Sequence, residues 1–364
     1  VYLSVFHPDF ELLMDTKKIN ADEKVRLATL SLGAIIHDKF MELAEKNEIA
    51  YAFYPHSIYK KYGVHLDEIK MDEWYDKLAA DEDIRKKEIN PRQMLTKIAQ
   101  MQQESGYPYT IFIDTANKEH ILKDVGLIKM SNLCCEIFQY QTSSDIKGYG
   151  EENKWGQDIS CNLGSLNIAN VMDNKDIERT VDTAIRALTF VSDETDINQV
   201  PTVKKGNDKS HSIGLGAMNL HGYLVRENIL YTSDEAVEFC DVFFAMIRYY
   251  AIKASMKIAI ERKKTFDGFE KSEYAKGRKS SVLSRYYEEN YLPKSDKIKS
   301  LFEGIYIPTK EDWANLLDEV KEKGIYNAYL TAIAPTQSIS YVQNATSSIM
   351  PITEPVEVRT YGDS

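Results

Sequence analysis

The sequence predicts an α/β protein in which strands alternate with helices around a mostly parallel sheet. Short runs rich in β-branched and aromatic residues are repeatedly followed by longer segments with apolar residues at helical spacing. No internal repeat is visible over the 364 residues. This alternation favours an α/β barrel or a doubly wound sheet, and both place functional loops at the carboxyl ends of strands.

The first elements are predicted as strand, helix, strand and irregular helix. Residues 1–6 are rich in β-branched and aromatic side chains and predict a strand. Residues 20–45 predict a helix, because an asparagine at its start is followed three positions later by a glutamate, as in a capping box. Residues 49–54 predict a second strand, and the charged, aromatic stretch 55–87 predicts irregular helix.

A helix and a buried strand are predicted next. Asn90 is followed by proline at the first helical position, and Gly106 stands where a helix would end. Residues 109–114 predict a buried strand. The apolar side chains expected to face the core from the helix are Leu95, Ile98 and Met101.

The second half of the chain begins with a predicted helix at 176–191 and a polar loop at 206–208. Residues 232–235 cap the clearest helix of the sequence. Its apolar stripe is Val237, Cys240, Phe244, Ile247, Ala251, Ala254 and Ile258. Cys240 is therefore interpreted as a core residue.

The last third begins with a tyrosine-rich, basic stretch at about 265–300, which is interpreted as a linker. A helix is predicted from 309 to 324 and a strand at 329–334 that runs into Pro335. The loops after the strands, including both cysteine-containing runs and the turn at Pro335, are candidates for the carboxyl-end face of the sheet.

Composition and charge exclude several classes of protein. A net charge of −11 argues against a nucleic-acid-binding protein, which would show clustered basic residues. No apolar run approaches the roughly 18 residues of a membrane span, and no signal peptide is recognisable at the start. Four cysteines in 364 residues do not form a disulfide framework, so a reducing, cytoplasmic location is expected.

Three of the four cysteines lie in two short runs, at 131–137 and 159–167. Cys134 and Cys135 are adjacent, so on a strand they would point to opposite faces, with Asn132 and Glu136 on the face of Cys134. Two buried structural thiols are one interpretation. The other is a site that combines sulfur chemistry with a base, because a buried unpaired carboxylate is costly. Cys161 is expected at a strand end, within reach of Cys134.

Other motifs are weaker. The seven histidines show no metal-ligand spacing, and no nucleophile elbow is present, so neither a zinc site nor a serine hydrolase is expected. Gly214 and Gly216 do not form a dinucleotide fingerprint, because Asn219 replaces the third glycine, and they are interpreted as a close helix contact. Residues 335–340 offer backbone N–H groups and hydroxyls suited to a phosphate, although an ordinary helix cap explains them equally well.

Together these motifs resemble the catalytic large (α) subunits of class I ribonucleotide reductases, most closely class Ib. The resemblance extends along the whole chain in the family's order. It is carried by residues 132–137 (NLCCEI), 158–167 (DISCNLGSLN), 211–222 (HSIGLGAMNLHG), 334–340 (APTQSIS) and 344–346 (NAT). It implies a ten-stranded α/β barrel built of two half-barrels, with residues 1–364 forming one catalytic barrel domain that is only part of the full subunit.

The resemblance also implies roles for individual residues. Cys134 would become the thiyl radical that abstracts the ribose 3′ hydrogen, Glu136 would be the base on the 3′-hydroxyl, and Asn132 would hydrogen-bond the sugar. Cys161 would be one of two cysteines that reduce the 2′ position. The substrate-binding residues implied are Leu133, Pro335, Thr336, Gln337, Ser338 and Ile339. Gln337 departs from the family, which has a small residue there, and Cys135 is a second thiol expected to face the core.

The resemblance implies partners as well. The substrate would be a ribonucleoside diphosphate, the radical would come from a metal-containing small (β) subunit, and a thioredoxin- or glutaredoxin-type protein would restore the thiols. No cofactor would bind this chain directly, and α is expected to form a homodimer. The chain is expected to be a fragment or one piece of a split α subunit, inactive alone. The alternatives are an anaerobic class III enzyme, whose glycyl-radical segment is absent, and a non-catalytic nucleotide-binding or assembly piece.

Overall fold

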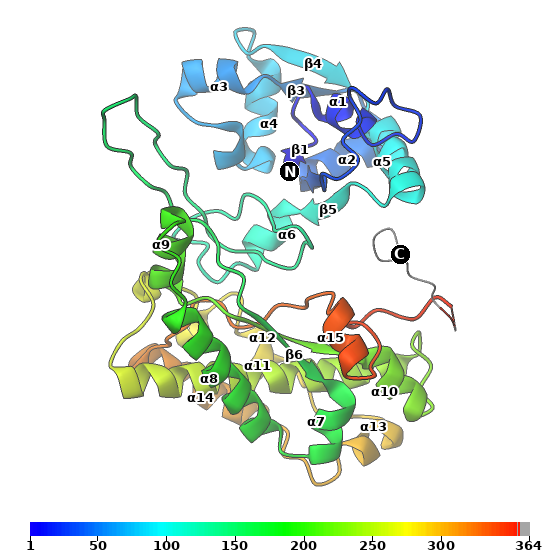
Figure 1. The fold of residues 1–364 in the computed structure, drawn as a ribbon, viewed down its shortest axis with the longest axis vertical. Coiled ribbons are helices and arrows are strands. Elements are labelled where there is room, and N and C mark those ends of the chain that lie inside the picture. Colours follow the sequence, from blue (N-terminus) through cyan, green and yellow to red (C-terminus); the bar gives the residue numbers. More distant parts are fainter. Residues whose placement is uncertain (355, 357–364) are drawn as a thin grey trace. The chain divides into compact units, whose positions relative to one another are not determined.

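The computed structural model describes residues 1–354 and 356. The chain divides into two compact units, Val1–Gln141 and Thr142–Ser364. Figure 1 shows the helices and strands of both units, and each unit is described by itself. In both units helices follow strands, so the predicted α/β class is confirmed.

The first unit is built on a parallel sheet of order β1-β2-β5. These strands are Tyr2–Ser4, Gly33–Ile36 and Tyr109–Phe112. In the register, Ile35 of the central strand lies opposite Ser4 on one side and Ile111 on the other. A separate antiparallel pair joins β3 (Ala50–Phe53) to β4 (Lys86–Ile89). The strands predicted at 1–6, 49–54 and 109–114 are therefore present, each somewhat shorter than predicted.

Six α-helices and one short 3₁₀ helix complete this unit. They are α1 (Phe10–Asp15), α2 (Asp38–Lys46), α3 (Pro55–Tyr62), η1 (Leu66–Glu68), α4 (Met71–Ala80), α5 (Pro91–Ser105) and α6 (Ile113–Lys118). Their apolar faces enclose a core in which Phe6, Phe40 and Phe53 are fully buried. α5 begins and ends as predicted: Asn90 accepts a hydrogen bond from the Gln93 amide, and Gly106 ends it in the left-handed region. Of its predicted core residues, Leu95 is only partly buried.

The helix predicted at 20–45 is wrong over its first half. Residues 20–32 form turns and irregular chain, β2 follows, and only α2 is helical. Val25 is 57% exposed and Leu30 is 39% exposed, so the first apolar residues after the capping-box pattern do not pack into a core. Hydrogen bonding of β2 between two parallel strands outweighed the local helix signal.

The second unit contains the parallel pair β6 (Leu163–Asn167) and β7 (Gly214–Met218). The strand predicted at 329–334 is present only as an extended segment with one parallel bridge, from Thr331 to Leu215. The two glycines of β7 were predicted to mark a close helix contact, and this prediction is wrong. A Cβ on Gly216 would lie 2.2 Å from the carbonyl oxygen of Ala332, so they admit this extended segment instead.

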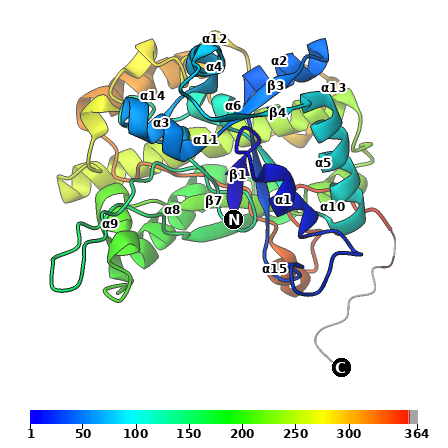
Figure 2. The same ribbon diagram turned by 90° about the horizontal axis from the view of Figure 1, so that it is seen from above.

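Helices form most of this unit. They are α7 (Ile168–Asn174), α8 (Ile177–Glu194), α9 (Pro201–Ser210), α10 (Leu220–Arg226), α11 (Asp234–Arg262), α12 (Arg285–Glu288), α13 (Asp296–Leu301), α14 (Lys310–Lys323) and α15 (Gln337–Val342), with η2 (Phe269–Lys271) and η3 (Gly277–Lys279) between them. The long helix α11 packs against α8 and α14, as Figures 1 and 2 show. The starts predicted for α11 and α14 are confirmed, with caps at Ser233 and Thr309, and the helix predicted at 176–191 is present as α8, which Asp176 caps.

Three further predictions for this unit are corrected. The polar loop at 206–208 lies inside α9, where Gly206 and Asn207 are buried against other elements. The linker at 265–300 is folded into short helices and holds Tyr274, which is fully buried. In α11, Val237 is 60% exposed and Cys240 is half-buried, because only part of the proposed stripe faces α8 and α14. No helix in the described part of the chain combines the length and apolar character that crossing a membrane requires.

Candidate functional site

Cys134 lies in a tight turn, not on the predicted strand. The backbone N–H of Cys135 donates to the carbonyl oxygen of Asn132, and Cys135 has a φ of +66°, in the left-handed region. The side-chain oxygen Oδ1 of Asn132 accepts from the backbone amides of Glu136 (3.0 Å) and Ile137 (3.1 Å). The turn is therefore closed by its own asparagine, and the alternation of faces expected of a strand does not apply.

Two neighbours fix this turn within the first unit. The hydroxyl of Tyr2, on β1, donates to the carbonyl oxygen of Asn132 at 2.8 Å. The hydroxyl of Ser131 donates to the carbonyl oxygen of Ile137 at 2.7 Å. Cys135 packs against a cluster of buried isoleucines, as predicted for the thiol facing the core. The turn is therefore anchored through its two ends and through Cys135.

The side chains of the turn differ in their exposure to solvent. Cys134 and Leu133 are exposed, whereas Glu136 is partly buried. Although the residue is exposed, partial desolvation of the thiol and the nearby Glu136 carboxylate raise the pKa of Cys134, which favours the form with hydrogen on sulfur. Oxygen Oε2 of Glu136 is inaccessible to solvent and has no hydrogen-bond partner among the described residues. An unsatisfied buried carboxylate oxygen is rare in a purely structural position.

Cys161 is exposed and lies two residues before β6, so it is at the amino end of that strand and not at a carboxyl end as predicted. The reason is the strand register. The carbonyl oxygen of Asn162 accepts from the amide of Gly214 at 2.8 Å, which starts the pairing of β6 with β7 immediately after the cysteine.

Residues 335–339 lie toward the other end of the same strand pair. Thr336 has a φ of +61° and precedes the six-residue helix α15. Its hydroxyl oxygen accepts from the Ser348 amide at 2.7 Å, so the side chain supports the following loop. Pro335 is partly buried, whereas Gln337, Ser338 and Ile339 are exposed. About five strand residues, each roughly 3.3 Å long, separate this loop from Cys161.

Three of the sequence motifs meet next to α15. The side chain of Asn219 donates to Oδ1 of Asn167 at 3.0 Å and accepts from the amide of Thr346 at 3.1 Å. The amide of Asn219 in turn donates to the carbonyl oxygen of Thr346. Asn219 also has a left-handed φ, +70°, which asparagine tolerates. These hydrogen bonds join the carboxyl ends of β6 and β7 to the 344–346 motif. The sequence alone did not indicate that these motifs contact one another.

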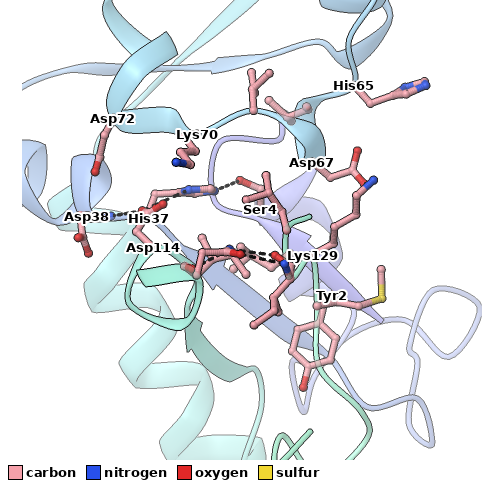
Figure 3. A pocket seen from close by; sticks show the side chains of 18 of the residues that line it. Tyr2, Ser4, His37, Asp38, His65, Asp67, Lys70, Asp72, Asp114 and Lys129 are labelled. Carbon is pink, nitrogen blue, oxygen red and sulfur yellow. Dashed lines mark hydrogen bonds and ion pairs between the residues drawn. The ribbon is translucent and has the colours of Figure 1, made fainter. Parts of the chain in front are cut away.

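A pocket of about 700 Å³ opens in the first unit, beyond the ends of β1, β2 and β5 (Figure 3). Nε2 of His37 forms a hydrogen bond with the hydroxyl of Ser4 at 3.1 Å. The other ring nitrogen, Nδ1, lies 3.6 Å from Oδ2 of Asp114. Tyr2 lines this pocket and also contacts the Cys134 turn. The site residues predicted from the sequence do not line the pocket.

Carboxylates of Asp38, Asp72 and Asp114 come together beside this pocket, with one oxygen of each within 4.8 Å of the others. Asp114 accepts from the amide of Asp38, and Asp72 accepts from the amide of Lys39. Both amides belong to the first turn of α2, where carboxylates are stabilised by the helix N-terminus. Burial and the neighbouring Asp114 and Asp38 raise the pKa of Asp72.

The structure thus brings Asn132, Cys134 and Glu136 together in one turn of the first unit. It holds Cys161 and residues 335–339 in the second unit. Sequence reasoning missed Tyr2, which anchors the turn, and Asn207, which contacts the residue before Cys161. No local pattern pointed to either, because both act on residues more than 40 positions away.

The fold and these residues define an α/β protein with an exposed thiol beside a carboxylate. A family model for the barrel domain of ribonucleotide reductase matches residues 1–364. The chain is 51% identical over 363 residues to the ribonucleoside-diphosphate reductase subunit alpha of Bacillus subtilis, covering all of this chain and 51% of that protein. This chain therefore belongs to the ribonucleotide reductase barrel-domain family, as its motifs predicted.

More distant relatives agree. Identity is 42% over 365 residues to the subunit alpha of Mycoplasma pneumoniae, covering all of this chain and 50% of that protein. It is 30% over 370 residues to the subunit alpha of Chlamydia pneumoniae, covering 97% of this chain and 32% of that protein. The chain spans about half the length of the first two relatives and about a third of the last.

Proposed function

We propose that this chain forms the catalytic barrel of a class Ib-like ribonucleoside-diphosphate reductase, an enzyme that makes 2′-deoxyribonucleotides for DNA synthesis. The observation that carries the proposal is the Cys134 turn, where an exposed cysteine stands two residues from a partly buried carboxylate, one oxygen of which has no hydrogen-bond partner among the described residues. Hydrogen-atom chemistry requires the protonated thiol, and the raised pKa favours that form further. Oxygen Oε2 of Glu136 has no hydrogen-bond partner among the described residues, and in the proposal the Glu136 carboxylate accepts from a substrate hydroxyl.

The proposed reaction begins at sulfur. The Cys134 thiyl radical abstracts the 3′ hydrogen of the ribose, so a C–H bond breaks and an S–H bond forms. Glu136 accepts the proton of the 3′-hydroxyl, and the 2′-hydroxyl takes a proton from one of two reducing thiols and leaves as water. Cys161 and a second thiol supply two electrons, the remaining thiol hydrogen goes to carbon 2′, and the two sulfurs end as a disulfide. Glu136 returns its proton to the 3′ oxygen. Cys134 then returns its hydrogen atom to carbon 3′, which regenerates the radical.

Residues of both units take part in this proposal. Nδ2 of Asn132 faces the sugar while Oδ1 holds the turn, and Leu133 contacts the substrate. Pro335, Thr336, Gln337, Ser338 and Ile339 receive the diphosphate. The nucleotide would lie along the β6–β7 pair, with its ribose toward Cys161 and its phosphates toward α15. Residues 1–364 would form one ten-stranded barrel whose interior excludes water.

Partners complete the proposed cycle. A metal-containing small subunit supplies the radical to Cys134, and a thioredoxin- or glutaredoxin-type reductant restores the Cys161 thiol. The α subunit would act as a homodimer, with this chain forming part of it, either as a fragment or as one piece of a split subunit.

The proposal is tested by assembling the chain with the remaining α segments and a small subunit, and assaying CDP reduction. The wild-type assembly is expected to form deoxy-CDP, and the Cys134→Ser assembly is expected to form none. A Cys240→Ser variant is the matched control and should keep its activity, because that half-buried thiol lies within α11.

Two results would contradict the proposal. Equal activity of the wild type and of Cys134→Ser would remove Cys134 from the mechanism. Absence of activity in every assembly, together with retained binding of the nucleotide, would favour a non-catalytic nucleotide-binding or assembly piece.

A further inference from the structure

The segment that carries Cys161 is held on both sides by a buried polar network. The hydroxyl of Ser160 donates to Oδ1 of Asn207 at 2.9 Å. Nδ2 of Asn162 donates to the carbonyl oxygen of Ser212 at 3.2 Å and lies 3.4 Å from Oδ1 of Asn207. The thiol between these two residues is exposed. The neighbours of Cys161 are therefore anchored, while the cysteine itself is exposed.

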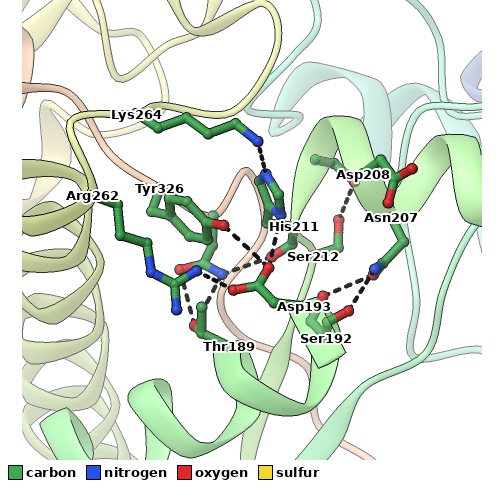
Figure 4. A network of polar contacts seen from close by, with 12 residues as sticks. Thr189, Ser192, Asp193, Asn207, Asp208, His211, Ser212, Arg262, Lys264 and Tyr326 are labelled. Atoms are coloured by element: carbon green, nitrogen blue, oxygen red, sulfur yellow. Dashed lines mark hydrogen bonds and ion pairs between the residues drawn. The ribbon is translucent and has the colours of Figure 1, made fainter. Parts of the chain in front are cut away.

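Asn207 is itself fixed by α8 (Figure 4). Its Nδ2 donates to the carbonyl oxygen of Ser192 at 2.7 Å, and the Ser192 hydroxyl donates to its Oδ1 at 2.8 Å. Asn207 is 4% exposed and Ser192 is fully buried. These bonds fix which end of the amide is oxygen and which is nitrogen, so Oδ1 must face the Cys161 segment.

The residue before Asn207 brings α9 against the same segment. A Cβ on Gly206 would lie 1.8 Å from the carbonyl oxygen of Asp158, so only glycine permits this approach. The amide of Asp158 also donates to the carbonyl oxygen of Thr202, on the first turn of α9, at 3.0 Å. Two adjacent residues of α9 therefore contact the segment around Cys161. Gly206 packs against its backbone, and Asn207 forms hydrogen bonds with it.

We infer that Asn207 is a positioning residue, which sets the direction of the Cys161 thiol through Ser160 and Asn162. The use of that thiol rests on the function proposed above. A buried amide costs desolvation that an apolar side chain would avoid, and here its oxygen accepts from both neighbours of the cysteine. A displacement of about 1 Å at a reacting group can lower a rate roughly 10²-fold.

The experiment compares Asn207→Ala and Ser160→Ala with wild type and with Asn198→Ala, a change at an exposed asparagine between α8 and α9. The reduced complete reductase is treated with iodoacetamide, and alkylation of each cysteine is followed by mass spectrometry. Asn207→Ala is expected to change the rate at Cys161 by about fivefold or more, and Ser160→Ala by less in the same direction. Rates at Cys134 and Cys240 are expected to stay unchanged in all variants.

Turnover separates positioning from a merely structural effect. Asn207→Ala is expected to lower kcat for CDP reduction about 10- to 100-fold while KM stays within about twofold, because the diphosphate loop is untouched. Asn198→Ala should leave both unchanged.

A wild-type alkylation rate at Cys161 in folded Asn207→Ala would overturn the inference. If Asn207→Ala does not fold, the milder Ser160→Ala decides in the same way. Failure of the proposed function has a different signature: Cys134→Ser would keep its activity, whatever Asn207→Ala does to the thiol of Cys161.

Discussion

The two cysteines at the centre of the proposal are held in opposite ways. The Cys134 turn is closed by residues within five positions of it, since Oδ1 of Asn132 binds the amides of Glu136 and Ile137. The Cys161 segment makes its bonds to residues about 45 to 50 positions away, on and after α9. The Cys134 turn is thus closed by local turn chemistry and held from a distance only at Tyr2 and Cys135, whereas the Cys161 segment depends on hydrogen bonds to α9 and to the residues that follow it.

The two regions differ in whether the residues that hold the cysteine also take part in the proposed reaction. Near Cys134, the residues that shape the turn are also those proposed to act on the substrate, so substitutions there should affect the reaction directly. Near Cys161, the supporting residues lie on α8 and α9 and are not among the residues proposed to bind the nucleotide. Substitutions there should act through the position of the sulfur.

The largest expected effects distinguish the two cysteines by the reaction step in which each one acts. Cys134→Ser should abolish product formation, and also the release of tritium from carbon 3′ that occurs when sulfur-bound tritium exchanges with water before its return, each by about 10³-fold or more. Cys161→Ser should abolish product formation equally, but tritium loss should stay within about tenfold of wild type, because the hydrogen abstraction precedes reduction. Both quantities are measured on 3′-tritiated CDP. Loss of tritium release in Cys161→Ser would show that the two cysteines do not act in this order.

Glu136→Gln should have the next largest effect. It keeps the size of the side chain but removes the base, and general-base catalysis is typically worth about 10²- to 10⁴-fold in rate. The steady-state rate of CDP reduction measures this loss, and exposed Glu151→Gln is the matched control. A wild-type kcat in Glu136→Gln would show that the Glu136 carboxylate is not the catalytic base.

Gly206→Ala tests the support of Cys161 from the backbone side. The added Cβ would meet the carbonyl oxygen of Asp158, and such overpacking typically costs about 1–3 kcal/mol of unfolding free energy. Urea unfolding of the complete protein measures it. Gly148→Ala, where the nearest atom to the new Cβ is a side-chain oxygen at 3.4 Å, should be close to neutral. Equal stability of the two variants would mean that α9 does not lie against residue 158.

The smallest effect concerns acid stability of the first unit. Burial lowers the pKa of His120 to about 4, with a nearby Lys123 acting in the same direction. The unfolded chain takes up this proton near pH 6.5 and the folded chain does not, so stability falls as pH drops from about 6.5 to about 4. The loss is at most about 3 kcal/mol.

His120→Gln should flatten this dependence, which urea unfolding at several pH values measures. Exposed His56→Gln serves as the control and should keep the wild-type slope. An unchanged slope in His120→Gln would show that another group is responsible.

The sequence allowed prediction wherever a local signal agreed with the packing. The side chains of Asn90, Ser233 and Thr309, which were predicted to start helices, each accept a hydrogen bond from a backbone amide of the first turn. The same signal failed at residues 20–45, because β2 gains more from pairing with two strands than a helix would gain from exposed apolar residues.

The candidate site was predictable in its residue types but not in its geometry. Asn132, Cys134 and Glu136 were read as one face of a strand, whereas Cys135 adopts a left-handed φ that cysteine rarely adopts. Asn207 was placed in a loop, because nothing local shows that a buried amide contacts a segment 47 positions earlier. The resemblance to a family supplied roles, and contacts between distant residues had to come from the structure.

The most direct test of the account is an experimental structure of the complete α protein with a bound ribonucleoside diphosphate. The account predicts that the sulfur atoms of Cys134 and Cys161 and a carboxylate oxygen of Glu136 each lie within about 4 Å of the same ribose. A nucleotide bound elsewhere, or a separation of more than about 10 Å between either sulfur and the sugar, would contradict it.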